Sequence, residues 1–179
     1  MKMRMALVAL VATLSLGACA TVPPQSNANT LATAALANAS GQSVGSVEIV
    51  QSGTTVMFRA NVSGQASGEH GIHLHTTGRC EAPGFTTAGG HLNPTAHQHG
   101  SLNPAGPHVG DLPNIIVGPD GNGMIASQLT GTAADLLANL FDADGTAIVL
   151  HAGPDDYKTD PSGNSGGRIA CGVLLRFLL

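Results

Sequence analysis

Histidines crowd one irregular stretch of the sequence, residues 91–111. This stretch, HLNPTAHQHGSLNPAGPHVGD, contains His91, His97, His99, His108 and Asp111 and no Lys, Arg, Phe, Tyr, Trp or Cys. Its three glycines and three prolines exclude a regular helix or a central strand, because proline lacks a backbone donor and glycine favours turns. Imidazoles with one carboxylate are donors that Zn²⁺ prefers, and a long loop in a compact domain is typically functional. We therefore expect this loop to wrap around metal.

A second group of histidines lies on expected strands. Residues 69–76 read EHGIHLHT, and residues two apart on a strand share a face, so His73 and His75 should point one way and His70 the other. His151 closes another short expected strand at residues 147–150. We expect His70 to be a hydrogen-bonded structural residue and His97 to be an exposed one.

The remaining donors are six histidines and Asp111, which is one donor too few for two four-coordinate sites unless one imidazole uses both ring nitrogens. Spacing suggests a strand group of His73, His75 and His151 and a loop group of His99, His108 and Asp111. His91 lies between them in the sequence and would be the bridge. An all-imidazole site with an open position suits Cu(II), whereas three imidazoles and a carboxylate suit Zn²⁺. From the residues alone, a single zinc site and a loose copper-binding surface remain alternatives.

The segments around these donors predict an antiparallel all-β sandwich or barrel. Residues 54–62 alternate apolar and polar side chains with the period of a half-buried strand. Further strands are expected at 32–39, 44–50, 69–76, 113–117, 124–129, 147–150 and 169–178. Residues 133–140 can form one short helix or an irregular connection, and three long loops separate the later strands.

The N-terminus predicts export. Lys2 and Arg4 precede an apolar run at residues 5–16 that is too short to span a membrane comfortably, which is typical of a signal peptide over residues 1–18. The sequence LGAC ending at Cys19 resembles a bacterial lipobox, so we expect a lipidated Cys19, with ordinary cleavage as the alternative. Residues 19–31 then form a tether and residues 32–179 the domain. The expected location is the periplasm, with lipid anchoring to the membrane.

Length, charge and cysteines narrow the protein class. The 179 residues fit one domain, and 10% charged residues with a formal net charge of −4 give no reason to expect nucleic acid. Once Cys19 is assigned to processing, Cys80 and Cys171 remain as an even pair in an oxidising compartment. We expect a disulfide, whereas an intracellular protein could keep two free thiols.

Six ordered blocks resemble the copper/zinc superoxide dismutase family. They are GIHLH (71–75), GHLNP (90–94), HG (99–100), HVGDL (108–112), VLH (149–151) with Asp155 and Asp156, and GNSGGRIACG (163–172). No single block is specific, but the ordered set with matching ligand spacing is. The resemblance spans the sequence from about residue 32 onward.

The resemblance implies an eight-stranded Greek-key β-barrel, an immunoglobulin-like sandwich with long metal-binding and electrostatic loops. It also implies a copper site made by His73, His75, His91 and His151. A zinc site would share one histidine with it and consist of His91, His99, His108 and Asp111. The family disulfide would join Cys80 and Cys171. Asp155 would hydrogen-bond one copper and one zinc histidine, which fixes their tautomers. Arg168 would guide an anion to copper, with help from Lys158.

The implied activity is the conversion of superoxide to O₂ and hydrogen peroxide by alternate reduction and reoxidation of copper, with zinc in a structural role. His91 would supply one proton, and the short 151–168 loop matches bacterial members, so no further steering residue is carried over. A copper-carrying lipoprotein would not need Arg168. A zinc hydrolase would need a general base such as Glu beside an open zinc position, and the glutamates show no such placement. The sequence leaves the oligomeric state open, a homodimer included.

Overall fold

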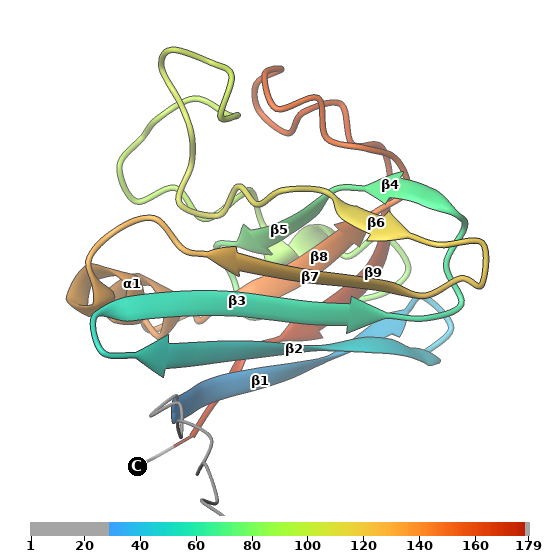
Figure 1. Ribbon diagram of the computed structural model, residues 1–179, viewed down its shortest axis with the longest axis horizontal. Coiled ribbons are helices and arrows are strands. Elements are labelled where there is room, and N and C mark those ends of the chain that lie inside the picture. The colour runs from blue at the N-terminus through green and yellow to red at the C-terminus, as the bar shows by residue number, and fades with distance from the viewer. Residues whose placement is uncertain (1–28, 178–179) are drawn as a thin grey trace, which may run out of the picture.

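The computed structural model describes residues 29–177, and these form an all-β barrel with one short helix (Figure 1). The predicted signal peptide and Cys19 lie outside the described residues. The first strands are β1 (Asn29–Asn38), β2 (Ser43–Ser52), β3 (Thr55–Val62), β4 (Gly68–His70) and β5 (Ile72–His75). After the 3₁₀ helix η1 (Thr86–Ala88) come β6 (Ile115–Val117), β7 (Gly123–Gln128), helix α1 (Ala133–Leu140), β8 (Ala147–His151), β9 (Arg168–Val173) and β10 (Leu175–Arg176).

The sheet curls so that its two edge strands, β4 and β5, are neighbours in the sequence. The strand order is β4-β6-β7-β3-β2-β1-β9-β8-β5, with β10 paired to β1, and every pairing is antiparallel. The edge strands β4 and β5 are joined by Gly71 alone, so the barrel is nearly closed. Strands distant in sequence, such as β3 and β7 or β1 and β9, lie side by side. The predicted all-β Greek-key barrel is confirmed.

The period-two pattern decides which side chains fill the barrel. In β3, Val56, Phe58, Ala60 and Val62 are buried, while the residues between them are exposed or half-buried. Residues 133–140 form the helix that the sequence left open. The Thr132 side chain caps it by accepting a hydrogen bond from the Asp135 amide, and Leu136 and Leu140 are buried on its inner face.

The structure has more strands than the eight predicted. The single strand expected at 69–76 is divided into β4 and β5, because Gly71 is the point where the chain leaves β6 and joins β8 at the opposite edge. A Cβ on Gly71 would lie 2.9 Å from the Ser165 Cβ, so the crossing needs glycine. The last predicted strand is likewise divided, because β9 pairs with β8 and β10 pairs with β1. Strand β1 begins at Asn29, three residues inside the predicted tether of residues 19–31.

Two long loops lie together at the top of Figure 1, above the strands β4 and β6. They are residues 91–111, hereafter the histidine loop, and residues 152–167, hereafter the closing loop. The amide of His99 donates to the Asp160 carboxylate at 2.7 Å, and the amide of Leu102 donates to the Tyr157 carbonyl at 2.9 Å. These bonds hold the loops against each other. Among residues 29–177, no helix is long and apolar enough to cross a membrane.

Candidate metal centre

Strand β5 and the histidine loop meet through isolated β-bridges. His73 pairs with Asp111 and His75 pairs with His91 in antiparallel bridges. Between them, Leu74 donates its amide hydrogen to the Gly110 carbonyl at 3.0 Å. A loop without regular structure is therefore registered against the strand that carries the H-x-H pair, and the predicted strand and loop donors come together.

The strand group forms a buried cluster with His91. The four members are His73, His75, His91 and His151, and their donor atoms lie within 4.8 Å of one another. Each ring has one buried nitrogen without a hydrogen-bond partner: Nδ1 of His73 and Nε2 of the other three. An unsatisfied buried nitrogen is costly, so four of them in one place indicate a ligand that accepts their lone pairs. This donor set fits copper.

The other nitrogen of each ring is held by a partner that fixes the ring's orientation. Nε2 of His73 lies 2.7 Å from the Asp155 carboxylate. Nδ1 of His75 lies 3.0 Å from the Gly89 carbonyl, and Nδ1 of His151 lies 3.2 Å from the Gly166 carbonyl. Because a carbonyl or carboxylate can only accept, these nitrogens carry the hydrogen and the opposite ones are left free to bind metal.

Burial keeps the rings of His75, His91 and His151 neutral at pH 7. It lowers the pKa of His75 to about 2 and that of His151 to about 3. Burial also lowers the pKa of His91 to about 4, although its hydrogen bond to Asp111 acts in the opposite direction. A metal ion approaching these three rings therefore meets lone pairs and has no proton to displace.

The loop group surrounds Asp111. The Nδ1 atoms of His91, His99 and His108 lie 2.8, 3.0 and 3.1 Å from one carboxylate oxygen of Asp111. The other oxygen accepts from the amides of Gly100 and His108, which fixes the carboxylate. Three imidazoles and one carboxylate converging in this way fit a four-coordinate zinc site. His91 contributes Nδ1 to this group and Nε2 to the other.

Asp155, the residue that the resemblance places between the two groups, contacts one ring of each. It is buried, and its two oxygens lie 2.7 Å from Nε2 of His73 and 3.0 Å from Nε2 of His99. Burial alone would lower the pKa of His99, but its hydrogen bonds to Asp111 and Asp155 raise it to about 9. The same bonds hold the pKa of both carboxyl groups below the usual range despite burial. At pH 7, His99 is thus a cation between two carboxylates.

Arg168 binds the chain segment that lies between Cys80 of the disulfide and the histidine loop. The disulfide joins Cys80 and Cys171, as predicted, with the Cα atoms 5.6 Å apart. The half-buried guanidinium of Arg168 donates to the carbonyls of Phe85 and Gly89, both at 2.7 Å. The Gly89 carbonyl also accepts from Nδ1 of His75, so the cation is fixed next to a histidine of the strand group.

The two histidines set aside lie outside both clusters. His70 is buried, and its ring nitrogens lie 2.8 Å from the His151 carbonyl and 2.9 Å from the Ala66 carbonyl, which confirms its structural role. His97 is exposed, as predicted, with Nδ1 3.1 Å from the Pro107 carbonyl. Lys158 is exposed on the closing loop.

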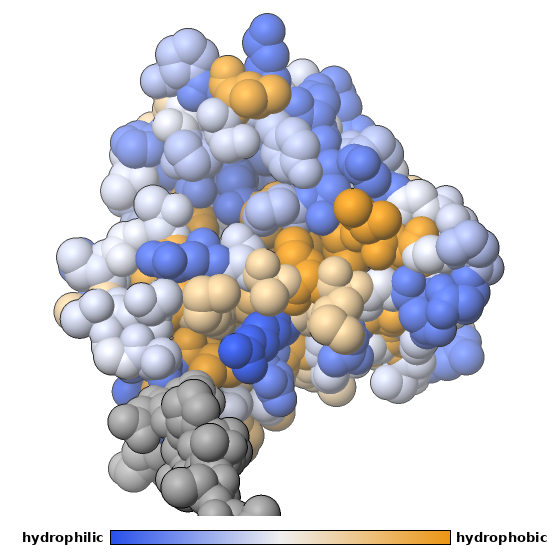
Figure 2. Space-filling view, in the orientation of Figure 1, coloured by the Kyte–Doolittle hydropathy of each residue, from blue (hydrophilic) through white to orange (hydrophobic). Residues whose placement is uncertain are grey.

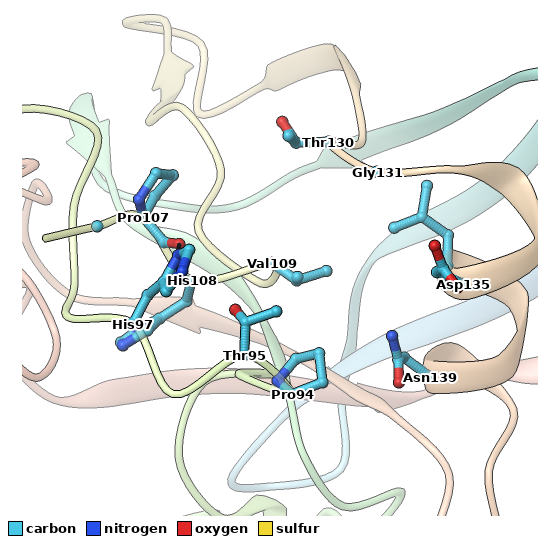
Figure 3. A pocket seen from close by; sticks show the side chains of 12 residues that line it. Pro94, Thr95, His97, Pro107, His108, Val109, Thr130, Gly131, Asp135 and Asn139 are labelled. Carbon is cyan, nitrogen blue, oxygen red and sulfur yellow. Dashed lines mark hydrogen bonds between the residues drawn. The ribbon is translucent and has the colours of Figure 1, made fainter.

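A cavity of about 440 Å³ lies between the histidine loop and α1 (Figure 3). Its wall includes Pro94, Thr95, His97 and His108 from the loop and Asn139 from the helix. None of the other cluster histidines lines it, so it is separate from the cluster of His73, His75, His91 and His151.

The structure also adds ligand-orienting groups that the sequence analysis missed. These are the carbonyls of Gly89 and Gly166 and the carboxylate of Asp160. Asp160 was visible in the sequence as an acid in the closing loop. Backbone carbonyls leave no residue-type signal, so the two glycines could not have been found.

Comparisons with known proteins agree with this geometry. A family model described as copper/zinc superoxide dismutase matches residues 43–174. Superoxide dismutase [Cu-Zn] 2 of Aquifex aeolicus is 42% identical over 146 residues, which cover 79% of this chain and 84% of that protein. The superoxide dismutase [Cu-Zn] of Caulobacter vibrioides is 40% identical over 147 residues, covering 80% and 84%.

A solved structure gives the same result for the fold. The crystal structure of a SOD-like protein from Bacillus subtilis superposes with a TM-score of 0.74 at 38% identity and covers 80% of this chain and 97% of that one. Sequence relatives, fold and two adjoining donor clusters all agree. The chain therefore belongs to the copper/zinc superoxide dismutase family.

Proposed function

We propose that His73, His75, His91 and His151 bind copper, and that His91, His99, His108 and Asp111 bind zinc. The observation that carries this proposal is the convergence of four buried, unpartnered ring nitrogens beside an Asp111-centred cluster that shares His91. The protein is an oxidoreductase that acts on superoxide, with copper and zinc as its cofactors. When bound, copper supplies the one-electron chemistry that turns one superoxide into O₂ and a second, with two protons, into hydrogen peroxide.

His91 is proposed to hold and deliver one of those protons at Nε2. Its Nδ1 belongs to the zinc cluster, so the ring stays oriented whether or not Nε2 is a metal ligand. Nε2 is buried, has no hydrogen-bond partner among the described residues and faces the other three rings of the copper-binding cluster, so a proton held there can pass to an acceptor in that cluster. Asp155 keeps the neighbouring His73 ring in the tautomer that leaves Nδ1 free.

Arg168 is proposed to attract the superoxide anion. Its guanidinium is held by two carbonyls and not by a carboxylate, so its charge is not cancelled by an ion pair within the described residues. A fixed positive charge beside the copper cluster raises the local anion concentration in an otherwise acidic protein. Lys158 adds a second positive charge on the closing loop.

A metal titration tests the assignment. Copper added to zinc-loaded and to zinc-free protein should give different optical spectra, because a shared imidazole couples the two metals. Each metal should bind with a stoichiometry of about one per chain, as the two donor clusters require. Identical copper spectra with and without zinc would show that His91 does not serve both ions.

We also propose that Cys19 is lipidated and that the lipid anchors the domain in the periplasm. The support is the LGAC sequence after a short apolar segment with two basic residues before it. Cys19→Ala should release or misprocess the protein while the barrel stays folded. Mass spectrometry of the wild-type mature chain would disprove the anchor if no lipid were attached.

A homodimer is proposed through the outer face of β6 and β7. Apolar surface gathers there (Figure 2), and Ile116 and Met124 are 67% and 80% exposed. Exposed apolar patches on soluble domains mark association sites. Sedimentation should show a dimer that Met124→Glu disrupts, with Leu102→Glu, at an exposed apolar site on the histidine loop, as the control. A wild-type monomer at all concentrations would remove the proposal.

A further inference from the structure

The side chain of Asn114 pairs with both backbone groups of Asp155. The Asp155 amide donates to Oδ1 of Asn114 at 2.8 Å, and Nδ2 of Asn114 donates to the Asp155 carbonyl at 3.0 Å. Asn114 is 9% exposed and Asp155 is 3% exposed, so these bonds are shielded from water. One planar amide therefore fixes the peptide groups on both sides of the Asp155 side chain.

Asn114 is itself anchored to the barrel. It directly precedes β6, whose first residue, Ile115, pairs with His70 of β4. The backbone amide of Asn114 donates to the Tyr157 hydroxyl at 2.8 Å. The amide of Tyr157 in turn donates to the Asp155 carboxylate at 2.6 Å, so Tyr157 holds both residues from the closing loop.

This anchoring determines where the Asp155 carboxylate lies. That carboxylate contacts a ring from each cluster, His73 at 2.7 Å and His99 at 3.0 Å. Ligand geometry must hold within about 0.5 Å for a functional site. A shift of the Asp155 backbone would therefore change both rings together.

We propose that Asn114 is the positioning residue that aligns the two metal sites through Asp155. The inference rests on the proposed function, because it takes His73 as a copper ligand and His99 as a zinc ligand. Asparagine fits this position since the Asp155 peptide groups need one donor and one acceptor in a plane. Aspartate offers no donor, and alanine leaves a buried amide and a buried carbonyl unpaired.

The test compares zinc affinity and ring signals between variants. Asn114→Ala should weaken zinc binding roughly tenfold in a chelator competition, the lower end of what loss of a ligand-orienting partner costs. In ¹⁵N-histidine NMR of the zinc-loaded protein, the Nε2–H signals of His73 and His99 should both shift or broaden. A residue that only stabilised the fold would leave those two signals unchanged below the unfolding temperature.

Asn103→Ala is the matched control. Asn103 is another loop asparagine, and it links the histidine loop to the closing loop through the Lys158 carbonyl at 3.5 Å without contacting Asp155. Its zinc affinity should stay within about twofold of wild type. Equal losses in Asn103→Ala and Asn114→Ala would show general loosening of the loops and overturn the proposal.

Asp155→Ala distinguishes an error in the positioning role of Asn114 from an error in the proposed metal sites. If Asp155→Ala weakens zinc binding and perturbs the His99 signal while Asn114→Ala does neither, the positioning role is wrong and the site assignment stands. If Asp155→Ala changes nothing, the proposed sites themselves are wrong. Should Asn114→Ala not fold, Tyr157→Phe carries the test, and unchanged His73 and His99 signals in that variant overturn the positioning role.

Discussion

Removal of the Cys80–Cys171 disulfide should destabilise the barrel by several kcal/mol. The two cysteines are 91 residues apart in sequence. Closing a loop of that length restricts the unfolded chain by about 4 to 5 kcal/mol in the chain-entropy model. The double variant Cys80→Ala/Cys171→Ala avoids a free thiol, and its midpoint of thermal unfolding should fall by about 10 °C or more.

Urea unfolding of metal-free protein is the appropriate assay, because bound metal stabilises the folded state independently. The free energy of unfolding should fall more steeply with urea concentration in the variant, since its unfolded chain exposes more surface without the cross-link. The variant should also lose part of its superoxide reactivity, because the carbonyls of Phe85 and Gly89 that hold Arg168 lie in the segment anchored by Cys80. A loss of less than about 1 kcal/mol in the free energy of unfolding would refute the entropic argument.

The other predictions concern the two clusters and their charges. His91→Ala should disturb the binding of both metals, whereas His99→Ala should chiefly remove zinc and leave copper bound. If His91→Ala left both metal stoichiometries and the copper spectrum unchanged, a single-metal protein would be the better account. Arg168→Ala should slow the reaction and weaken its dependence on ionic strength while the copper spectrum is kept, and an unchanged rate at low salt would assign the steering elsewhere. Zinc binding at pH 7 should release about one proton, because hydrogen bonds to two carboxylates outweigh burial and raise the pKa of His99 to about 9. Calorimetry in buffers of different ionisation enthalpy measures this release, and the absence of any release would contradict the raised pKa. Metal-free protein should lose stability as the pH falls from about 6.5 to 4. Over this range the histidines of the unfolded chain take up protons, whereas buried His75, His91 and His151, with pKa values of about 2, 4 and 3, do not; each lowers the free energy of unfolding by about 1.4 kcal/mol per pH unit. A free energy of unfolding that does not change over this range would contradict the lowered pKa values.

The sequence by itself determined the types of the candidate metal donors, their grouping and the class of fold. The alternation of apolar side chains at residues 56–62 requires a sheet with one buried face, and the structure has β3 there. His73 and His75 share a face because the side-chain period of a strand is two. The glycines and prolines of residues 91–111 excluded regular structure, so the loop donors had to be arranged by something other than a helix or strand. Each of these properties is local, and a local property can be read from neighbouring residues.

Only the tertiary structure decided how each ring is turned and where the strands divide. The free nitrogen of His75 is Nε2 because the Gly89 carbonyl takes the hydrogen of Nδ1, and a backbone carbonyl has no residue-type signature. Asn114 reaches Asp155 across 41 positions, and neither residue's neighbours in sequence indicate the pairing. The division of β4 from β5 at Gly71 likewise depends on closure of the barrel, which brings the two edges of the sheet together. These features arise from contacts between distant segments, and such contacts exist only once the chain has folded.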